Sequence, residues 1–139
     1  MTVTECFETK SCRNVLRGLH YQSNRPQAKL VRACIGEVWD VAVDLRRDSP
    51  TFLKWYARTL SDVNREMLYI SPGFAHGFFV LSRQALVGYH CFGAYDKQSD
   101  TGVAWNDPDL AVSWPIPPGV TPIISGRDRS LPFVREVLR

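Results

Sequence analysis

Residues 37–45 read EVWDVAVDL, and this stretch decides the fold class that the sequence predicts. β-Branched and aromatic residues fill it over the length of one strand, which predicts a β-strand. Residues 29–35 form a second β-rich run, and Gly36 with Glu37 between the two runs predicts a tight hairpin connection. We therefore expect two adjacent strands here.

Further short runs with strand character lie on either side of this pair, separated by Gly, Pro, Asn, Asp or Ser. They span residues 15–21, 55–60, 67–70, 77–81 and 86–92. At least seven strands joined by turns predict an all-β barrel or sandwich with little helix. Helix is expected only as one turn at residues 61–65 and a short terminal segment at 131–138. The proline-rich residues 107–122 predict an extended arm over the barrel surface.

The composition predicts one globular domain, spanning residues 1–139, because 45% of the residues are hydrophobic and can form a core. A net charge of +3 argues against nucleic acid as a partner. Arg outnumbers Lys by 13 to 4, which favours a small anionic ligand. No signal peptide or CxxC pair accompanies the four cysteines, so we expect reduced thiols. No apolar run approaches the roughly 20 residues of a membrane span, so we expect a soluble cytoplasmic protein.

Two of the three histidines lie in motifs that are dense in chemistry. His20 is part of VLRGLHYQ at residues 15–22, where strand alternation puts it on the face of Gly18 unless that glycine marks a bulge. His76 follows a Pro-Gly turn in SPGFAHGF at residues 71–78, which resembles the second motif of the cupin barrels. Either side chain could instead be a core histidine that is satisfied by a backbone carbonyl.

A metal site of the cupin kind would need more ligands than this sequence supplies. In metal-using cupins the first motif contributes an HxH pair and a Glu, whereas here the corresponding place offers only His20. His90 would have to come from another strand to complete such a site. We expect no metal ligand set, and a metal-dependent cupin remains a third-ranked alternative.

Five motifs occur in the order seen in nucleotide-sugar 3,5-epimerases. They are RGLHYQ, QAKLVR, GEVWDVAVDLRRDSPTF, YISPGFAHGF and WNDPDLAVSWP. Over residues 15–128 the chain resembles the dTDP-4-dehydrorhamnose 3,5-epimerase family. The resemblance implies a cupin-like double-stranded β-helix, or jelly roll, that needs no cofactor. It also implies epimerisation at carbon 3, carbon 5 or both of a nucleoside-diphosphate 4-keto-6-deoxy sugar.

The same resemblance implies which residues react. His20 matches the histidine that abstracts the proton beside the sugar ketone, and Asp128 matches the carboxylate that orients it. Tyr89 matches the tyrosine that returns a proton to the opposite face of the sugar ring. Without the resemblance, Asp128 would be interpreted as a solvated loop residue and Tyr89 as ordinary barrel packing.

The resemblance further implies a set of substrate contacts. Arg17 and Lys29 match cations near the ketone and the phosphates, where fixed positive charge stabilises an enolate. The other matched positions are the substrate-contacting His76, Tyr95 stacked on the nucleotide base, the acidic Asp100, and Arg127 directed toward the diphosphate.

The sequence departs from the family before residue 15. Relatives usually carry a longer segment there, with an arm that reaches the nucleotide of the neighbouring subunit, and we expect the single domain of this chain to lack it. Relatives also have Gln and Asn where Glu5 and Phe7 align. The alternative function is therefore a catalytically silent cupin that binds a sugar nucleotide. An exposed sheet edge left without the arm favours a homodimer.

Overall fold

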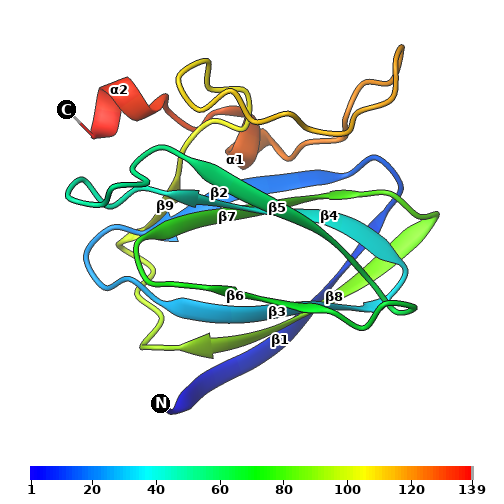
Figure 1. Cartoon of the computed structure of the whole chain (residues 1–139), viewed down its shortest axis with the longest axis horizontal. Coiled ribbons are helices and arrows are strands. Elements are labelled where there is room, and N and C mark those ends of the chain that lie inside the picture. The colour runs from blue at the N-terminus through cyan, green and yellow to red at the C-terminus, as the bar shows by residue number, and fades with distance from the viewer. Residues whose placement is uncertain (139) are drawn as a thin grey trace.

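The computed structural model describes residues 1–138, which form two antiparallel sheets packed face to face (Figure 1). The four-stranded sheet has the order β1 (Val3–Cys12), β8 (Gln84–Phe92), β3 (Ala28–Ile35) and β6 (Met67–Ile70). The five-stranded sheet has the order β5 (Trp55–Ser61), β4 (Glu37–Asp44), β7 (Phe74–Val80), β2 (Leu16–Gln22) and β9 (Asp100–Gly102). This two-sheet arrangement confirms the expected all-β jelly roll.

The strand β4 explains why residues 37–45 carry such a strong signal. It lies inside the five-stranded sheet, between β5 and β7, and both of its faces are covered. Val38 and Ala42 pack into the core between the sheets, whereas Val41 and Val43 pack on the other face against Leu110 of the C-terminal segment. A strand that is buried on both faces becomes an almost continuous apolar run.

Residues 103–138 cover the outer face of the five-stranded sheet. Figure 1 shows this segment, coloured yellow to red, above that sheet, and it contains the helices α1 (Gly126–Arg129) and α2 (Val134–Val137). Residues 107–122 contain no strand, as predicted for the extended proline-rich arm. Trp114 of this arm packs against Trp39 of β4, with 5.4 Å between the ring centroids.

The predicted hairpin between residues 29–35 and 37–45 is wrong. The two runs do form strands, β3 and β4, but these strands belong to different sheets. Gly36 connects them alone with a φ of +83°, and a one-residue connection is too short for the two-residue loops that join most hairpins. The chain therefore passes from one sheet to the other at Gly36.

The other strand predictions are confirmed, with small shifts at the ends. The largest shift is in β7, which begins at Phe74, three residues before the predicted start. Residues 62–64 form a turn, and α2 lies within the predicted terminal helix. Two strands were not predicted, namely β1 and the three-residue β9. The strand β1 was missed because it is a mostly exposed edge strand in which charged and polar residues outnumber the large apolar ones.

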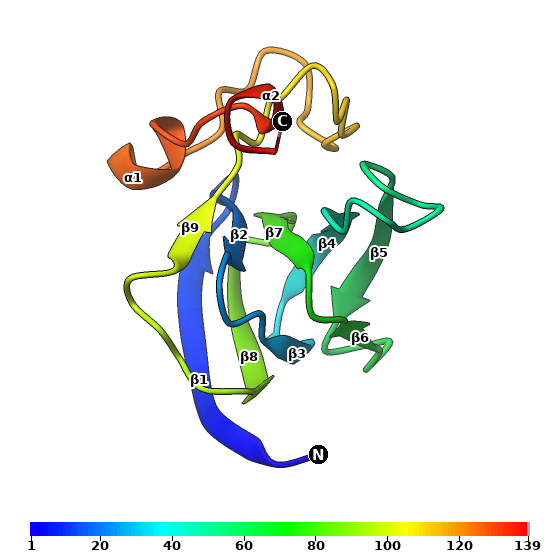
Figure 2. The same ribbon diagram turned by 90° about the vertical axis from the view of Figure 1, so that its left-hand side faces the viewer.

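Figure 2 shows β1 running along the edge beside β8, with the N-terminus on the side of the barrel opposite to the C-terminal helices.

Within residues 1–138 we find no helix with the length and apolar character that crossing a bilayer requires.

Candidate active site

Two connected pockets lie between the sheets and hold almost all of the predicted site residues. The outer pocket has a volume of about 290 Å³ and is lined by Tyr95, Asp100 and Arg127, among others. The inner pocket, of about 130 Å³, is lined by side chains that include Arg17, His76 and Tyr89. The residues Phe7, His20 and Lys29 line both pockets and therefore mark their junction.

His20 and Asp128 form a close pair, although 108 residues separate them in the sequence. The Nε2 atom of His20 lies 2.6 Å from Oδ1 of Asp128, which is buried, and the other carboxylate oxygen accepts the backbone N–H of Gly18 at 3.0 Å. Burial alone would raise the pKa of Asp128, but the hydrogen bonds from His20 and Gly18 lower it below its ordinary value. Because an ionised carboxylate only accepts, Nε2 of His20 is the donor to Asp128.

Asp128 is held in place by the first turn of α1. Ser125 caps this short helix, and its hydroxyl accepts the backbone N–H of Asp128 at 3.1 Å. The predicted alternative of a solvated loop aspartate is therefore wrong, since the carboxylate is buried behind His20.

A bulge in β2 directs His20 and Arg17 into the same pocket. The register of β2 against β7 shifts between these two residues, so the simple alternation of a strand is broken there. Gly18 has a φ of +125°, and a Cβ atom at this position would lie 2.7 Å from the Cα of Gly77. Only glycine fits this close approach of two backbones, which aligns His20 with His76 across the strand pair.

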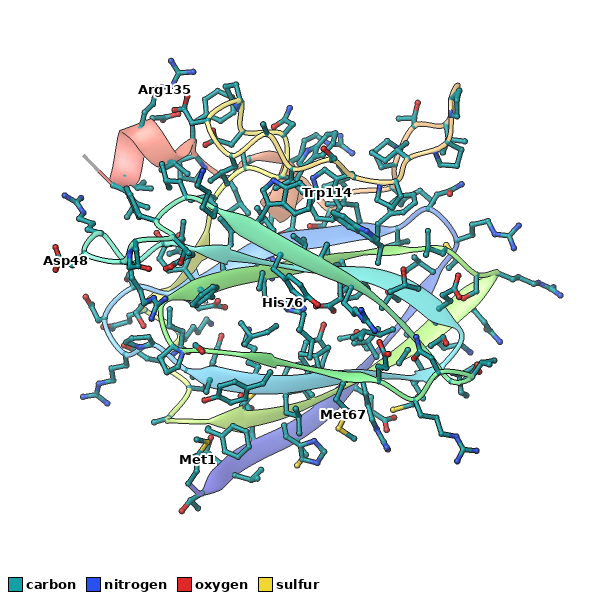
Figure 3. The ribbon with its side chains drawn as sticks, viewed as in Figure 1. Met1, Asp48, Met67, His76, Trp114 and Arg135 are labelled. Carbon is teal, nitrogen blue, oxygen red and sulfur yellow. The ribbon has the colours of Figure 1, made fainter. Side chains whose placement is uncertain are left out.

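His76 belongs to a second histidine–carboxylate pair that the sequence analysis missed. Its Nε2 atom lies 2.8 and 2.9 Å from the two carboxylate oxygens of Asp40, and both side chains are buried. Figure 3 shows His76 between the two sheets. Desolvation raises the pKa of Asp40, and the neighbouring His76 opposes this rise. The signal for Asp40 was present, because it is a lone acidic residue inside the apolar run of β4.

Tyr89 approaches the inner pocket from the sheet opposite to His20. It lies on β8 of the four-stranded sheet, whereas His20 lies on β2 of the five-stranded sheet. Burial raises the pKa of Tyr89, and the negative charge of Asp40 adds to the effect. The Tyr89 ring contacts His76 edge-on at 5.9 Å and stacks on Phe7 at 4.5 Å between centroids.

Two basic side chains, Lys29 and Arg17, also line the inner pocket. Lys29 is on β3, where burial lowers its pKa and the nearby Cys91 and Asp100 oppose that change. Arg17 donates from Nε to the hydroxyl of Ser11 at 2.9 Å, which fixes the direction of its guanidinium.

The outer pocket ends in a small polar cluster at the surface. The hydroxyl of the exposed Tyr95 donates to Oδ2 of Asp100 at 3.2 Å, and Arg127 forms an ion pair with the same oxygen at 3.2 Å. The negative charge of Asp100 raises the pKa of Tyr95. Three of the predicted substrate-binding residues, Tyr95, Asp100 and Arg127, thus lie together at the rim of the outer pocket.

The structure offers no support for the metal-dependent alternative. Among residues 1–138, no group of three or more His, Cys, Asp or Glu side chains is arranged to hold a metal ion. Tyr89 and Cys91 point inward from β8, so His90 between them points to the outer face of the sheet.

Comparisons with known proteins agree over nearly the whole chain. The family model for dTDP-4-dehydrorhamnose 3,5-epimerase matches residues 1–136. The enzyme of that name from Methanothermobacter thermautotrophicus is 47% identical over 129 residues, which are 93% of this chain and 70% of its own length.

Solved structures show the same fold. The dTDP-4-dehydrorhamnose 3,5-epimerase of Elizabethkingia anophelis superimposes with a TM-score of 0.94 at 43% identity, over 99% of this chain and 75% of that one. The dTDP-6-deoxy-D-glucose-3,5-epimerase of Legionella pneumophila, in complex with dTDP-4-keto-L-rhamnose, gives a TM-score of 0.92 at 40% identity, over 98% and 71%. On this agreement of sequence and cupin-like fold, the chain belongs to the dTDP-4-dehydrorhamnose 3,5-epimerase family of isomerases.

Proposed function

We propose that this chain inverts carbon 3, carbon 5 or both of a dTDP-linked 4-keto-6-deoxy sugar, with the residues of the inner pocket as its catalytic groups. Membership of the epimerase family supports the reaction class. The observation that carries the assignment of roles is that His20, on one sheet and held by Asp128 of α1, lines the inner pocket together with Tyr89 of the other sheet. Inversion requires a base and an acid on opposite faces of the sugar ring.

Proton abstraction is the task of His20. Its Nδ1 atom takes the proton from the ring carbon beside the ketone, and the electrons of the broken C–H bond form an enolate. Asp128 holds the imidazole by its Nε2–H and stabilises the positive charge that the ring acquires. Lys29 and Arg17 provide the positive charge that the enolate oxygen needs in a site with little water.

Proton return is the task of Tyr89. The enolate electrons form a new C–H bond with the phenolic proton, on the face opposite to His20, and leave a tyrosinate. The phenol is protonated at neutral pH, because the ordinary pKa of a tyrosine is 10.0 and burial raises the pKa of Tyr89 further. His20 then releases its proton to solvent and the tyrosinate of Tyr89 takes one up, so the enzyme returns to its starting state without a cofactor.

The nucleotide is assigned to the outer pocket. Tyr95 offers an aromatic face for the base, Arg127 a cation for the diphosphate, and Asp100 an acceptor for a hydroxyl or an N–H group. The Legionella relative was solved with a dTDP-linked keto sugar, which supports this ligand class.

Proton NMR in heavy water tests the reaction. Purified protein is incubated with dTDP-4-keto-6-deoxyglucose, and the hydrogen signals of carbons 3 and 5 are followed. We expect exchange at one or both carbons, and its loss in His20→Ala. Tight binding of the sugar nucleotide with no deuterium uptake would instead establish the binding-only alternative.

We also propose that the protein is a cytoplasmic homodimer. The outer edge of β1 is a long row of backbone groups that pairs with no other strand among residues 1–138, and such edges attract a second chain. All four cysteines are free, in keeping with a reducing compartment. Light scattering during size exclusion tests the assembly, and a monomer at micromolar concentration would contradict it. Cell fractionation tests the compartment.

A further inference from the structure

Phe7 touches the proposed proton donor directly. It lies on the edge strand β1, opposite Tyr89 in the β1–β8 register. The two rings are stacked with 4.5 Å between centroids and 11° between planes. Phe7 is 40% exposed whereas Tyr89 is only 7% exposed, so the phenyl ring covers one face of the phenol. A stacked aromatic pair prefers one relative orientation and resists its loss.

Phe7 also stands on the route to that donor. It is one of the three residues that line both pockets, and the other two are the proposed base His20 and the oxyanion partner Lys29. Tyr89 lines only the inner pocket. A sugar ring whose nucleotide occupies the outer pocket therefore meets Phe7, His20 and Lys29 together before it reaches Tyr89.

A second residue of β1 shows that this strand face is part of the site. Thr9 follows Phe7 by two positions, on the same face of the strand, and lines the inner pocket. Its hydroxyl is buried and lies close enough to the phenol of Tyr89 to oppose the rise in the pKa of that group.

We propose that Phe7 is a positioning residue for proton return: by stacking on Tyr89 it holds the phenol toward the sugar ring and thereby controls inversion rather than abstraction. This inference rests on the proposed epimerase function. His20 is held by Asp128 of α1, so removal of the phenyl ring from β1 leaves the hydrogen bond that orients the base in place. After abstraction in heavy water, a deuteron returned by His20 restores the original configuration of the carbon. A deuteron returned by Tyr89, from the opposite face, inverts that configuration.

The ratio of inversion to exchange separates these two steps. In heavy water, deuterium uptake into the unconverted substrate measures abstraction, and formation of the epimer measures return from the opposite face. Phe7→Ala and Phe7→Leu both remove the stack, and we expect the ratio to fall by about tenfold in each, as the loss of a stacked pair permits. Phe7→Tyr keeps the stack, and its ratio is expected to stay within about twofold of the original.

Glu8→Ala is the matched control, since Glu8 is exposed and points to the other face of the same strand. It should leave the ratio unchanged. An unchanged ratio in Phe7→Ala, or an equal fall in Phe7→Ala and Glu8→Ala, would overturn the proposal.

A second measurement detects the stack of Phe7 on Tyr89 independently of enzyme activity. The chain contains five tyrosines, so a spectrum of protein with ¹³C-labelled tyrosine rings has five sets of signals, and Tyr89→Phe assigns one of them. We expect the Tyr89 ring protons to be shifted by the ring current of Phe7, and this shift to disappear in Phe7→Ala but persist in Phe7→Tyr.

The two measurements distinguish the possible failures. A Tyr89 signal that does not respond to Phe7→Ala would overturn the stack itself, whatever the enzyme does. A stack that is present in a protein that exchanges neither carbon would overturn the proposed function, and with it the role of Phe7 in inversion.

Discussion

At the scale of single residues, the site relies on carboxylates that are buried behind imidazoles. Asp128 holds His20, and Asp40 holds His76, each through a short contact to Nε2. A buried carboxylate in this position sets the tautomer of the ring and stabilises its charged form. One such pair, His20 with Asp128, lies at the junction of the two pockets, where it has access to a substrate.

Replacement of Asp128 by Asn tests this arrangement. Asn keeps the shape of the side chain but loses the charge, so the imidazolium formed during abstraction is no longer stabilised. We expect the rate of solvent exchange to fall by roughly 10²–10⁴-fold. Circular dichroism of the variant serves as the control for folding, and full exchange activity in a folded Asp128→Asn protein would contradict the assignment.

At the scale of elements, the contact between β2 and β7 places both histidines. Gly18 and Gly77 face each other where the two backbones are closest, and their strands carry His20 and His76. The geometry of the inner pocket thus depends on residues that have no side chain.

Gly18→Ala should damage both stability and activity. The added methyl group would lie 2.7 Å from the Cα of Gly77, and the backbone has a φ of +125° that other residues rarely adopt. We expect a loss of about 1–3 kcal/mol in the free energy of unfolding, measured by urea titration, and slower exchange in the folded fraction. Gly126→Ala is the matched control, because a methyl group there meets open space. Equal stability of the two variants would count against this explanation.

The turn after β4 depends on one carboxylate. Asp44 is buried and accepts from Arg46 at 2.9 Å, from the backbone N–H of Arg46 at 3.0 Å and from Thr51 at 2.6 Å. The hydrogen bonds from Arg46 in particular hold the pKa of Asp44 well below its ordinary value of 3.8.

Asp44→Asn should therefore lower stability in a pH-dependent way. A carboxylate whose pKa is lower in the folded than in the unfolded state stabilises the fold above its unfolded pKa, and this contribution disappears as the pH falls through the folded pKa. At pH 7 we expect the variant to lose about 1–3 kcal/mol in the free energy of unfolding. The difference from the original protein should shrink below about pH 4, where Asp44 of the unfolded chain becomes protonated while Asp44 of the folded protein is still ionised. A difference that stays constant down to pH 2 would argue against this role.

At the scale of the whole molecule, the C-terminal segment and the five-stranded sheet share one packed layer. Trp39 of β4 contacts Trp55 of β5 at 5.8 Å and Trp114 of the arm at 5.4 Å between ring centroids. Asp128 reaches His20 from the same C-terminal segment. The site is thus complete only when this segment is docked on the barrel.

We expect the chain to unfold as a single cooperative domain. Tryptophan fluorescence reports on the contact between the arm and the sheet, and far-ultraviolet circular dichroism reports on the strands. Their urea transitions should coincide, because the arm is part of the same core. Trp114→Phe, which retains most of the packing, identifies the contribution of the arm to the fluorescence. Separate midpoints for the two signals would show that the arm is an independent unit.

Local sequence patterns were sufficient to predict most strands, because β-branched runs and their turn residues act over a few positions. They also indicated an all-β barrel or sandwich, and the resemblance to the family added the jelly roll and the residues that line the pockets. The same patterns predicted a hairpin at Gly36 that does not exist, and they missed the edge strand β1. The first error concerns which strands pair, and the second concerns an exposed edge strand that carries little apolar signal; pairing with distant residues decides both.

The sequence by itself therefore determined where seven of the nine strands among residues 1–138 lie, the fold class and the set of reactive residue types. Only the tertiary structure decided that Asp128 is buried behind His20, that Asp40 holds His76, and that Phe7 stacks on Tyr89. The physical reason is that periodicity and propensity depend on neighbours along the chain, whereas these three contacts join residues 36 to 108 positions apart. Two of them form when distant strands pair within a sheet, and the third forms when the C-terminal segment docks on the barrel.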